Sequence, residues 1–191
     1  MIETFFPNVE MSKFWEKTYE TVYMTGISLV FIFIFGILLG LLLFLTSKGN
    51  IWQNRVINWI IAAVVNIFRA IPFVILIILL IPFTRGIMGT MIGPNAALPA
   101  LIIGSAPFYA RMVEIGLREV NKGVIEAAQA MGARTSTIIF KVLLPESMPA
   151  IISGLTVTAI ALVGYTAIAG IIGAGGLGNY AHQYGFVRGN K

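Results

Sequence analysis

The sequence predicts an all-α fold, a polytopic bundle of membrane-spanning helices. Of its 191 residues, 58% are hydrophobic and 11% are charged, whereas a soluble domain carries about 25% charged residues. Four apolar stretches are long enough to cross a bilayer, because about 20 helical residues cover its hydrocarbon layer. The length suits a single transmembrane domain, residues 1–191.

The composition excludes several kinds of active site. The chain has no Cys, no Asp and one His, so it lacks the residues for a disulfide, a thiolate metal site or a Ser-His-Asp triad. No P-loop pattern occurs. We therefore expect no catalytic residue, metal or cofactor in this chain. The net charge of +5 fits the basic loops of membrane proteins, and no nucleic-acid partner is expected.

The first segment, about residues 3–20, predicts a helix that lies along the bilayer surface. Its aromatic side chains fall on one helical face, which suits the membrane interface. They are Phe14, Trp15, Tyr19 and Tyr23. A frayed chain end is the alternative interpretation. The first span follows at about 21–46, where a GxxxG pair, Gly36 and Gly40, would let another helix approach closely.

The second span is expected within residues 56–83, and it contains Arg69. Pro72 should bend the helix there. The spacing of charged residues places Arg69 and Arg111 at similar depth near the inner face, and Glu114, one turn from Arg111, could neutralise either of them. Two interpretations stay open: an ion-pair cluster that fixes helix positions, or a gate.

Two further spans complete the predicted bundle, at about 96–117 and 150–172. The glycine-rich stretch 84–95 is expected to be the loop before the third span. The fourth is crowded with small residues, which let helices pack closely and let a pathway run between them. Tyr165 and Gly164 could line such a path, although the Tyr165 hydroxyl could instead bond a neighbouring helix.

Residues 173–178 match the dinucleotide-binding pattern GxGxxG letter for letter. No strand precedes them and no acidic residue follows within reach, so the match does not indicate a nucleotide site. We interpret the stretch as a flexible outer loop.

The polar stretch 118–149 holds seven of the 21 charged residues of the chain. Apolar residues at helical spacing predict two short helices within about 121–145. Gly132 should separate these helices, and Pro145 and Pro149 should end the second. Two short helices beside a membrane predict a docking surface for a soluble partner. With this stretch inside, eight Lys and Arg lie inside and five outside, in agreement with the positive-inside rule.

This stretch carries a long, gapped motif. Glu126, Ala127 and Ala128 are followed after three residues by Gly132, and Leu144-Pro145 comes at the end, with Val142 at a position where Ile is usual. The chain thereby resembles the type I permeases of ATP-binding-cassette (ABC) importers, which carry this EAA signature. The resemblance implies that the loop inserts into a cleft of a separate ATPase subunit and transmits its motion to the membrane.

Within that family the chain resembles the methionine importer permeases over roughly residues 66–185. The resemblance implies a homodimer in the bacterial plasma membrane, two cytoplasmic ATPase subunits that hold ATP and Mg, and an extracytoplasmic substrate-binding protein or lipoprotein. It also implies five spans, of which four are visible here. Two alternatives remain: a permease for another amino acid or small solute, and a membrane scaffold subunit without a pathway.

Overall fold

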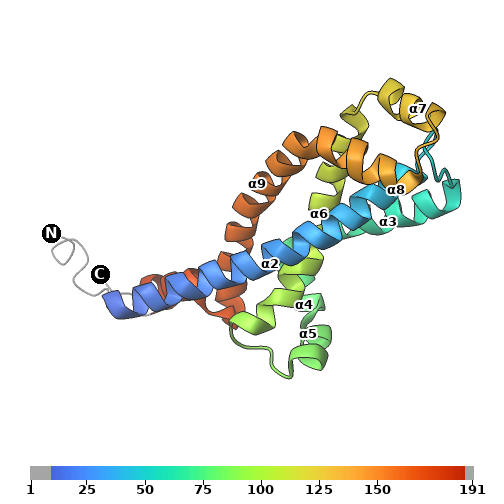
Figure 1. Ribbon diagram of the computed structural model, residues 1–191. Coiled ribbons are helices and arrows are strands. Elements are labelled where there is room, and N and C mark those ends of the chain that lie inside the picture. Colours follow the sequence, from blue (N-terminus) through green and yellow to red (C-terminus); the bar gives the residue numbers. More distant parts are fainter. Residues whose placement is uncertain (1–9, 188–191) are drawn as a thin grey trace. The chain divides into compact units, whose positions relative to one another are not determined.

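The computed structural model describes residues 10–187, and every regular element in that range is helical (Figure 1), which confirms the predicted fold class. The α-helices are α2 (Met11–Thr46), α3 (Arg55–Ala70), α4 (Phe73–Leu79), α5 (Ile81–Met88), α6 (Pro94–Glu119), α7 (Lys122–Ala130), α8 (Thr135–Ile138), α9 (Leu144–Ala169) and α10 (Gly176–Ala181). Three π-helical segments continue them: η1 (Ile139–Leu143), η2 (Gly170–Ala174) and η3 (His182–Val187).

Three helices of the described chain are long and apolar enough to cross a membrane, and a fourth span is counted if α3 and α4 are halves of one broken span. The three are Met11–Thr46, Pro94–Glu119 and Thr135–Ala174. The break between α3 and α4 falls at the predicted position. Pro72 lies just before α4, and its carbonyl accepts hydrogen bonds from the amides of Ile75 and Leu76. Pro72 therefore starts a new helix, because a residue before proline avoids helical angles.

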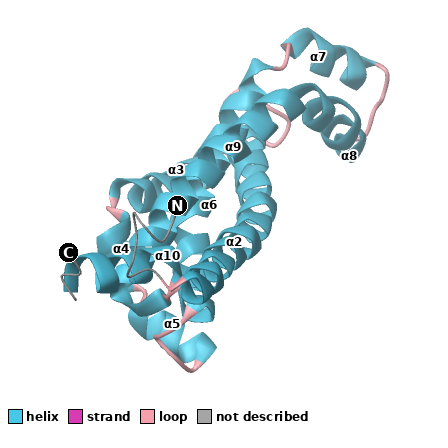
Figure 2. Ribbon diagram, turned by 90° about the vertical axis from the view of Figure 1, so that its left-hand side faces the viewer, coloured by secondary structure: helices cyan, strands magenta, loops and turns pink. Residues whose placement is uncertain are grey.

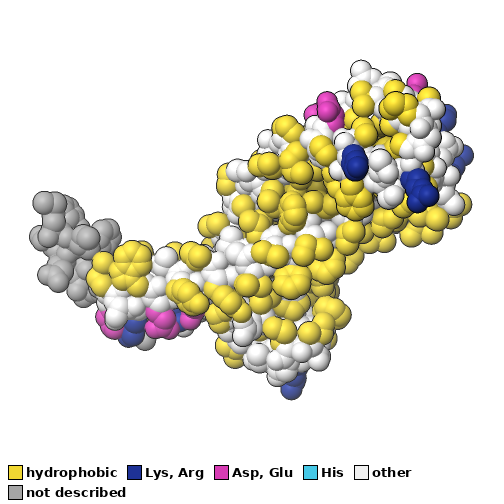
Figure 3. Space-filling model, viewed as in Figure 1, with side chains coloured by type: hydrophobic (Ala, Val, Ile, Leu, Met, Phe, Trp, Pro, Cys, Tyr) yellow, Lys and Arg dark blue, Asp and Glu magenta, His cyan; other side chains and the backbone are white. Residues whose placement is uncertain are grey.

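The chain divides into two compact units, which are described separately. The first unit consists of Met1–Val30, Ile71–Gly104 and Ala159–Lys191, and the second of Phe31–Ala70 and Ser105–Thr158. Short loops join the helices in each (Figure 2). In the second unit, charged side chains gather at the end that carries α7, whereas apolar side chains cover the sides of the long helices (Figure 3). Such apolar sides suit contact with lipid or with other helices.

Close packing of α2 on α6 holds the second unit together. A Cβ atom added to Gly40 would lie 2.7 Å from the carbonyl oxygen of Ala110 and 2.7 Å from the Cβ of Val113. Gly36 faces the ring of Tyr109 in the same way. The predicted role of this GxxxG pair, close approach of another helix, is thus confirmed, with α6 as the partner.

We expect Gly40→Ala to lower the thermal stability of the purified protein. The added methyl group pushes α6 away from α2, and overpacking of this kind costs about 1–3 kcal/mol. Gly26→Ala is the matched control in the same helix, because a Cβ there meets nothing within 4 Å. Alanine is the better helix former by up to about 1 kcal/mol, so Gly26→Ala should raise the midpoint of thermal unfolding. Equal effects of both substitutions would contradict this account.

In the first unit, α2 begins at Met11 and continues past residue 20 without a break. The hydroxyls of Thr18 and Thr21 donate to the carbonyls of Phe14 and Lys17, at 2.8 and 3.1 Å. No Pro or Gly occurs between residues 11 and 25 to interrupt the helix. Residues 3–9 of the expected surface helix lie outside the described residues, and its place along the bilayer stays a prediction.

The prediction of a loop over residues 84–95 is wrong for the first half of that stretch, which is helical because α5 extends to Met88. The amide of Thr84 donates to the carbonyl of Leu80 at 2.8 Å, and a proline lies in the first turn of α5, where its missing amide costs nothing. The helix ends at Gly89, whose φ of 71° lies in the left-handed region that glycine tolerates. Glycine here marks the end of a helix and not a long loop.

Candidate functional site

Helix α7 carries the residues of the EAA signature, and both of its ends are held by hydrogen bonds. The side chain of Asn121 accepts from the amide of Gly123 at 2.8 Å and caps the first turn. At the other end Gly132 has a φ of 77°. The amides of Gly132 and Ala133 donate to the carbonyls of Gln129 and Ala128, at 2.9 and 3.0 Å. This pair of bonds is a Schellman motif, which needs a left-handed residue after the helix.

The two sides of α7 face different surroundings. Ile125 and Ala128 are buried, and α7 packs against α8 and η1. Val124, Glu126 and Met131 are exposed, Met131 to 81% of its surface. An exposed methionine side chain is flexible and apolar, and such side chains are common at surfaces that bind other proteins. The helix is therefore anchored on one side and leaves an apolar and acidic side open.

The second half of the predicted hairpin differs from the expectation, because Pro145 and Pro149 do not end the helix. Residues 135–169 form one continuous helical run through α8, η1 and α9. The π-helical turn η1 comes immediately before Pro145, and a widened turn loosens the hydrogen-bond ladder that proline would disrupt. The Ser147 hydroxyl donates to the Leu143 carbonyl at 2.7 Å. Leu144 is half-buried and Pro145 exposed, so the signature runs directly into a membrane span.

Near the end of α6, one buried carboxylate joins two arginines. Glu114 is 2% exposed, and its two oxygens accept from Arg111 at 2.5 Å and from Arg118 at 2.7 Å. Arg111 also donates to the side chain of Asn66 on α3 at 2.9 Å. The predicted pairing of Arg111 with Glu114 is present, and the cluster ties α3 to α6.

Arg69 lies apart from this cluster. Its guanidinium group stands 6.0 Å from the ring centre of Phe108, within reach of a cation–π contact. Among residues 10–187, Arg69 forms no ion pair with Glu114, whose oxygens Arg111 and Arg118 occupy. From the sequence, Glu114 could neutralise either Arg69 or Arg111. Arg118, one turn further along α6, takes the second oxygen, and this i,i+4 pairing is a local one that the sequence analysis did not consider.

The two residues expected along a pathway belong to the first unit. The ring of Tyr165 stacks on that of Phe73, with centroids 4.5 Å apart and an interplanar angle of 14°. Gly164 is exposed, and a Cβ there would meet nothing within 4 Å. Stacking uses the faces of both aromatic rings, so Tyr165 helps to join α9 to α4.

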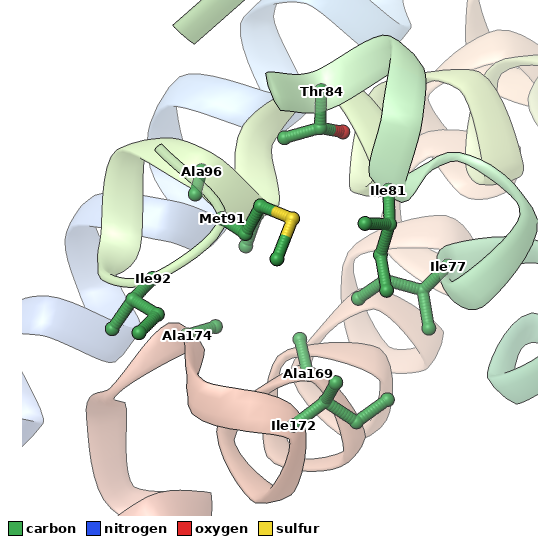
Figure 4. A pocket seen from close by; sticks show the side chains of 10 residues that line it. Ile77, Ile81, Thr84, Met91, Ile92, Ala96, Ala169, Ile172 and Ala174 are labelled. Atoms are coloured by element: carbon green, nitrogen blue, oxygen red, sulfur yellow. The ribbon is translucent and has the colours of Figure 1, made fainter. Parts of the chain in front are cut away.

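A cavity of about 260 Å³ also lies in the first unit, and Met91 extends into it (Figure 4). Its lining comes from α4, α5, the loop between α5 and α6, the start of α6 and the end of α9 with η2. The lining residues are Ile77, Ile81, Thr84, Met91, Ile92, Ala96, Ala97, Ala169, Ile172 and Ala174. Thr84 is the only polar side chain among them, so the cavity suits an apolar group. Neither Tyr165 nor Gly164 lines it.

The glycine-rich stretch 173–178 is not the flexible loop that we expected, because its second half is folded against α2. Glu20 accepts from the amide of Gly176 at 2.6 Å, and Thr21 accepts from the amide of Leu177 at 2.9 Å. Gly175 and Gly176 both have positive φ, and a Cβ on either would collide with the Glu20 or Thr21 side chain. Sequence reasoning missed Glu20, since no local pattern joins residues 156 positions apart.

Comparisons with known proteins agree with this architecture. The family described as "Binding-protein-dependent transport system inner membrane component" matches residues 32–183. The methionine import system permease protein MetP of Bacillus subtilis (strain 168) is 70% identical over 190 residues, which cover 100% of this chain and 86% of that protein. The D-methionine transport system permease protein MetI of Yersinia pestis is 51% identical over 152 residues, 80% of this chain and 70% of that protein.

A solved structure gives the same result in three dimensions. The structure titled "Inward facing conformations of the MetNI methionine ABC transporter: CY5 native crystal form" superposes with a TM-score of 0.91 at 48% sequence identity. The match covers 93% of this chain and 82% of that chain. With most of its length matched by the family and its helices superposing on those of an ABC transporter, the chain belongs to the inner membrane components of binding-protein-dependent transport systems.

Proposed function

We propose that this chain is the membrane permease subunit of an ATP-driven importer whose substrate is methionine. The observation that supports this substrate is the 70% identity to a methionine import permease over the whole chain. The protein is accordingly a multi-pass protein of the bacterial inner membrane.

Hydrolysis of ATP belongs to a separate cytoplasmic subunit in this proposal. Two copies of the permease pair with two ATPase subunits, which hold the ATP and Mg, and a substrate-binding protein or lipoprotein delivers methionine from outside. Similarity to the MetNI methionine ABC transporter supports the ATPase partner. The exposed side of α7, with Val124, Glu126 and Met131, is the surface that we assign to that partner.

The coupling step that we propose depends on how firmly α7 is attached. Contact with the ATPase presses on Glu126 and Ala127, while Ile125 and Ala128 are packed against the rest of the second unit. Movement of α7 is passed to α8 and η1, and from there through Leu144 and Pro145 into α9 without a loop in between. A continuous helix transmits displacement better than a flexible linker, which would absorb it.

We assign a structural role in gating to the cluster of Arg111 and Glu114. It lies on α6 close to α7, and it ties α3 to α6 through Asn66. The hydrogen bond from Arg111 to Asn66 joins the two helices, and the ion pair with Glu114 within α6 orients the Arg111 side chain for it. Arg69 remains a proposed gate residue, and Gly164 and Tyr165 remain proposed pathway residues, because of their positions in or beside the spans.

Uptake by reconstituted vesicles tests the substrate. The permease is reconstituted with its ATPase and binding protein, and ATP-dependent uptake of labelled methionine is measured with a tenfold excess of unlabelled competitor. We expect unlabelled methionine to reduce uptake roughly tenfold, as simple competition requires, and other amino acids to leave it unchanged. Competition by another amino acid with equal strength would identify a different substrate. Absence of any ATP-dependent uptake would favour the scaffold alternative.

A further inference from the structure

Positive charge dominates the stretch of chain between Glu20 and Glu114. Between Glu20 and Glu114 the sequence contains no acidic residue, but it contains five basic ones: Lys48, Arg55, Arg69, Arg85 and Arg111. Two of these, Lys48 and Arg55, flank the turn that joins α2 to α3, and both are exposed. Within residues 10–187 neither forms an ion pair. The turn therefore presents two positive charges that the described chain does not neutralise.

The same turn exposes two tryptophans. Trp52 is 49% exposed and Trp59 is 71% exposed. Tryptophan is enriched where a membrane meets water, because its ring is apolar and its N–H is a hydrogen-bond donor. We call Lys48, Trp52, Arg55 and Trp59 the α2–α3 corner.

Hydrogen bonds hold the backbone of the α2–α3 corner in one conformation, which fixes the positions from which its side chains extend. The amides of Trp52 and Asn54 donate to the carbonyls of Leu45 and Thr46, each at 3.0 Å. The Asn50 side chain donates to the Phe44 carbonyl at 2.7 Å. The Asn58 side chain donates back to the Leu43 carbonyl at 2.8 Å. These bonds fold the chain back on itself and fix the start of α3 against the end of α2.

Beyond the α2–α3 corner, α3 has an exposed apolar face. Val56, Ile60 and Val64 are exposed at intervals of one helical turn. Val65 is buried, and Asn66 accepts a hydrogen bond from Arg111 on α6. Two cations, two tryptophans and an apolar strip thus lie within residues 48–64. Together these side chains suit the headgroup, interface and acyl chains of a phospholipid.

The corner lies at the same end of the second unit as α7. Gly36 faces Tyr109 and Gly40 faces Ala110 and Val113, so α2 and α6 run in parallel here. Helix α2 ends at Thr46, six residues after Gly40. Helix α6 ends at Glu119, six residues after Val113, so the two helices end at the same level. The turn after α2 and the start of α7 are therefore at the same membrane face, which is the cytoplasmic one in the proposed function.

We propose that the α2–α3 corner binds the headgroup of an anionic phospholipid, whose acyl chains lie along the exposed face of α3. The phosphodiester is held by Lys48 and Arg55, and Trp52 and Trp59 pack at the level of the ester groups. Charge complementarity selects an anionic lipid over a zwitterionic one, because the corner has two cations and no acidic side chain. The inference does not depend on which solute the permease transports.

Native mass spectrometry of the purified permease–ATPase complex tests this inference. The complex is equilibrated with mixed micelles of phosphatidylglycerol and phosphatidylcholine in equal amounts, and the bound lipids are counted. We expect the wild type to retain phosphatidylglycerol preferentially. Lys48→Gln combined with Arg55→Gln should reduce that retention by about thirtyfold, since each basic residue near an anionic surface contributes a factor of about five. Arg85→Gln, which removes an exposed cation of the first unit, should leave retention unchanged.

Four outcomes would overturn the inference. One is a double variant that retains phosphatidylglycerol like the wild type, and another is an equal loss in Arg85→Gln. Displacement of the lipid by millimolar inorganic phosphate would indicate a site for a free anion. Loss of the ATPase from the double variant, with lipid retention unchanged, would indicate a protein partner. The midpoint of thermal unfolding, which we expect to be the same in all variants, separates a lost site from a misfolded protein.

Discussion

ATP-driven uptake of methionine should fall to background when Gly132 is replaced by valine. The residue has a φ of 77° and closes the Schellman motif after α7. Left-handed backbone costs a non-glycine residue about 1–2 kcal/mol, and β-branched residues tolerate it least. The substitution therefore displaces the end of α7, where the exposed Met131 lies, while the membrane spans keep their packing. Uptake by reconstituted vesicles and the amount of protein in the membrane are the measurements.

Two controls separate a coupling defect from simple backbone strain. Gly132→Asn should keep most of the uptake, because asparagine enters the left-handed region more readily than other non-glycine residues. Gly89→Val imposes the same kind of strain, at a φ of 71° with nothing near a Cβ, but far from α7 in sequence. It should retain uptake. Wild-type uptake in Gly132→Val, or equal loss in Gly89→Val, would refute the role of the α7 end in coupling.

The purified permease should lose about 2–3 kcal/mol of stability when Glu114 is replaced by alanine. Removing one partner of a buried ion pair costs about 3–5 kcal/mol when the remaining charge stays buried. The figure is reduced here because the Arg111 and Arg118 side chains are 25% and 52% exposed and can reach water in part. Thermal or denaturant-induced unfolding in detergent measures the change.

Two further substitutions make this result specific to the cluster. Glu114→Gln should cost less than alanine, because an amide oxygen still accepts a hydrogen bond from one arginine. Glu126→Ala removes an exposed carboxylate that forms no ion pair among residues 10–187, and its effect on unfolding should lie within about 0.5 kcal/mol. If Glu114→Ala were as mild as Glu126→Ala, the cluster would not stabilise the packing of α3 on α6.

Local chemistry made several features of this chain predictable. The apolar stretches predicted the membrane spans, because a bilayer of fixed thickness demands a fixed length of apolar helix. Pro72 predicted the interruption of the second span, since proline forbids helical angles at the residue before it. Gly132 predicted the end of α7, because its left-handed conformation is one that glycine alone adopts freely. Each of these inferences needs only a residue and its near neighbours.

The errors share a different cause. Pro145 and Pro149 were expected to end a helix, but the π-helical turn η1 before them lets the helix continue into α9. The stretch 84–88 was expected to be a loop because of its glycines, yet α5 includes it. In both places a detail of the local backbone decides the outcome: the widened turn η1 accommodates Pro145, and α5 runs on to the left-handed Gly89.

The sequence by itself determined the fold class, the positions of the spans and the polar hairpin with its EAA signature, because hydropathy and helix-ending residues act over a few positions along the chain. Tertiary structure alone decided that Arg69 lies against Phe108 and that Arg111 reaches Asn66 on α3. It also decided that Glu20 caps a glycine-rich turn 156 residues away. Such pairs depend on which helix faces meet in the folded protein, and no residue spacing in the sequence records that meeting.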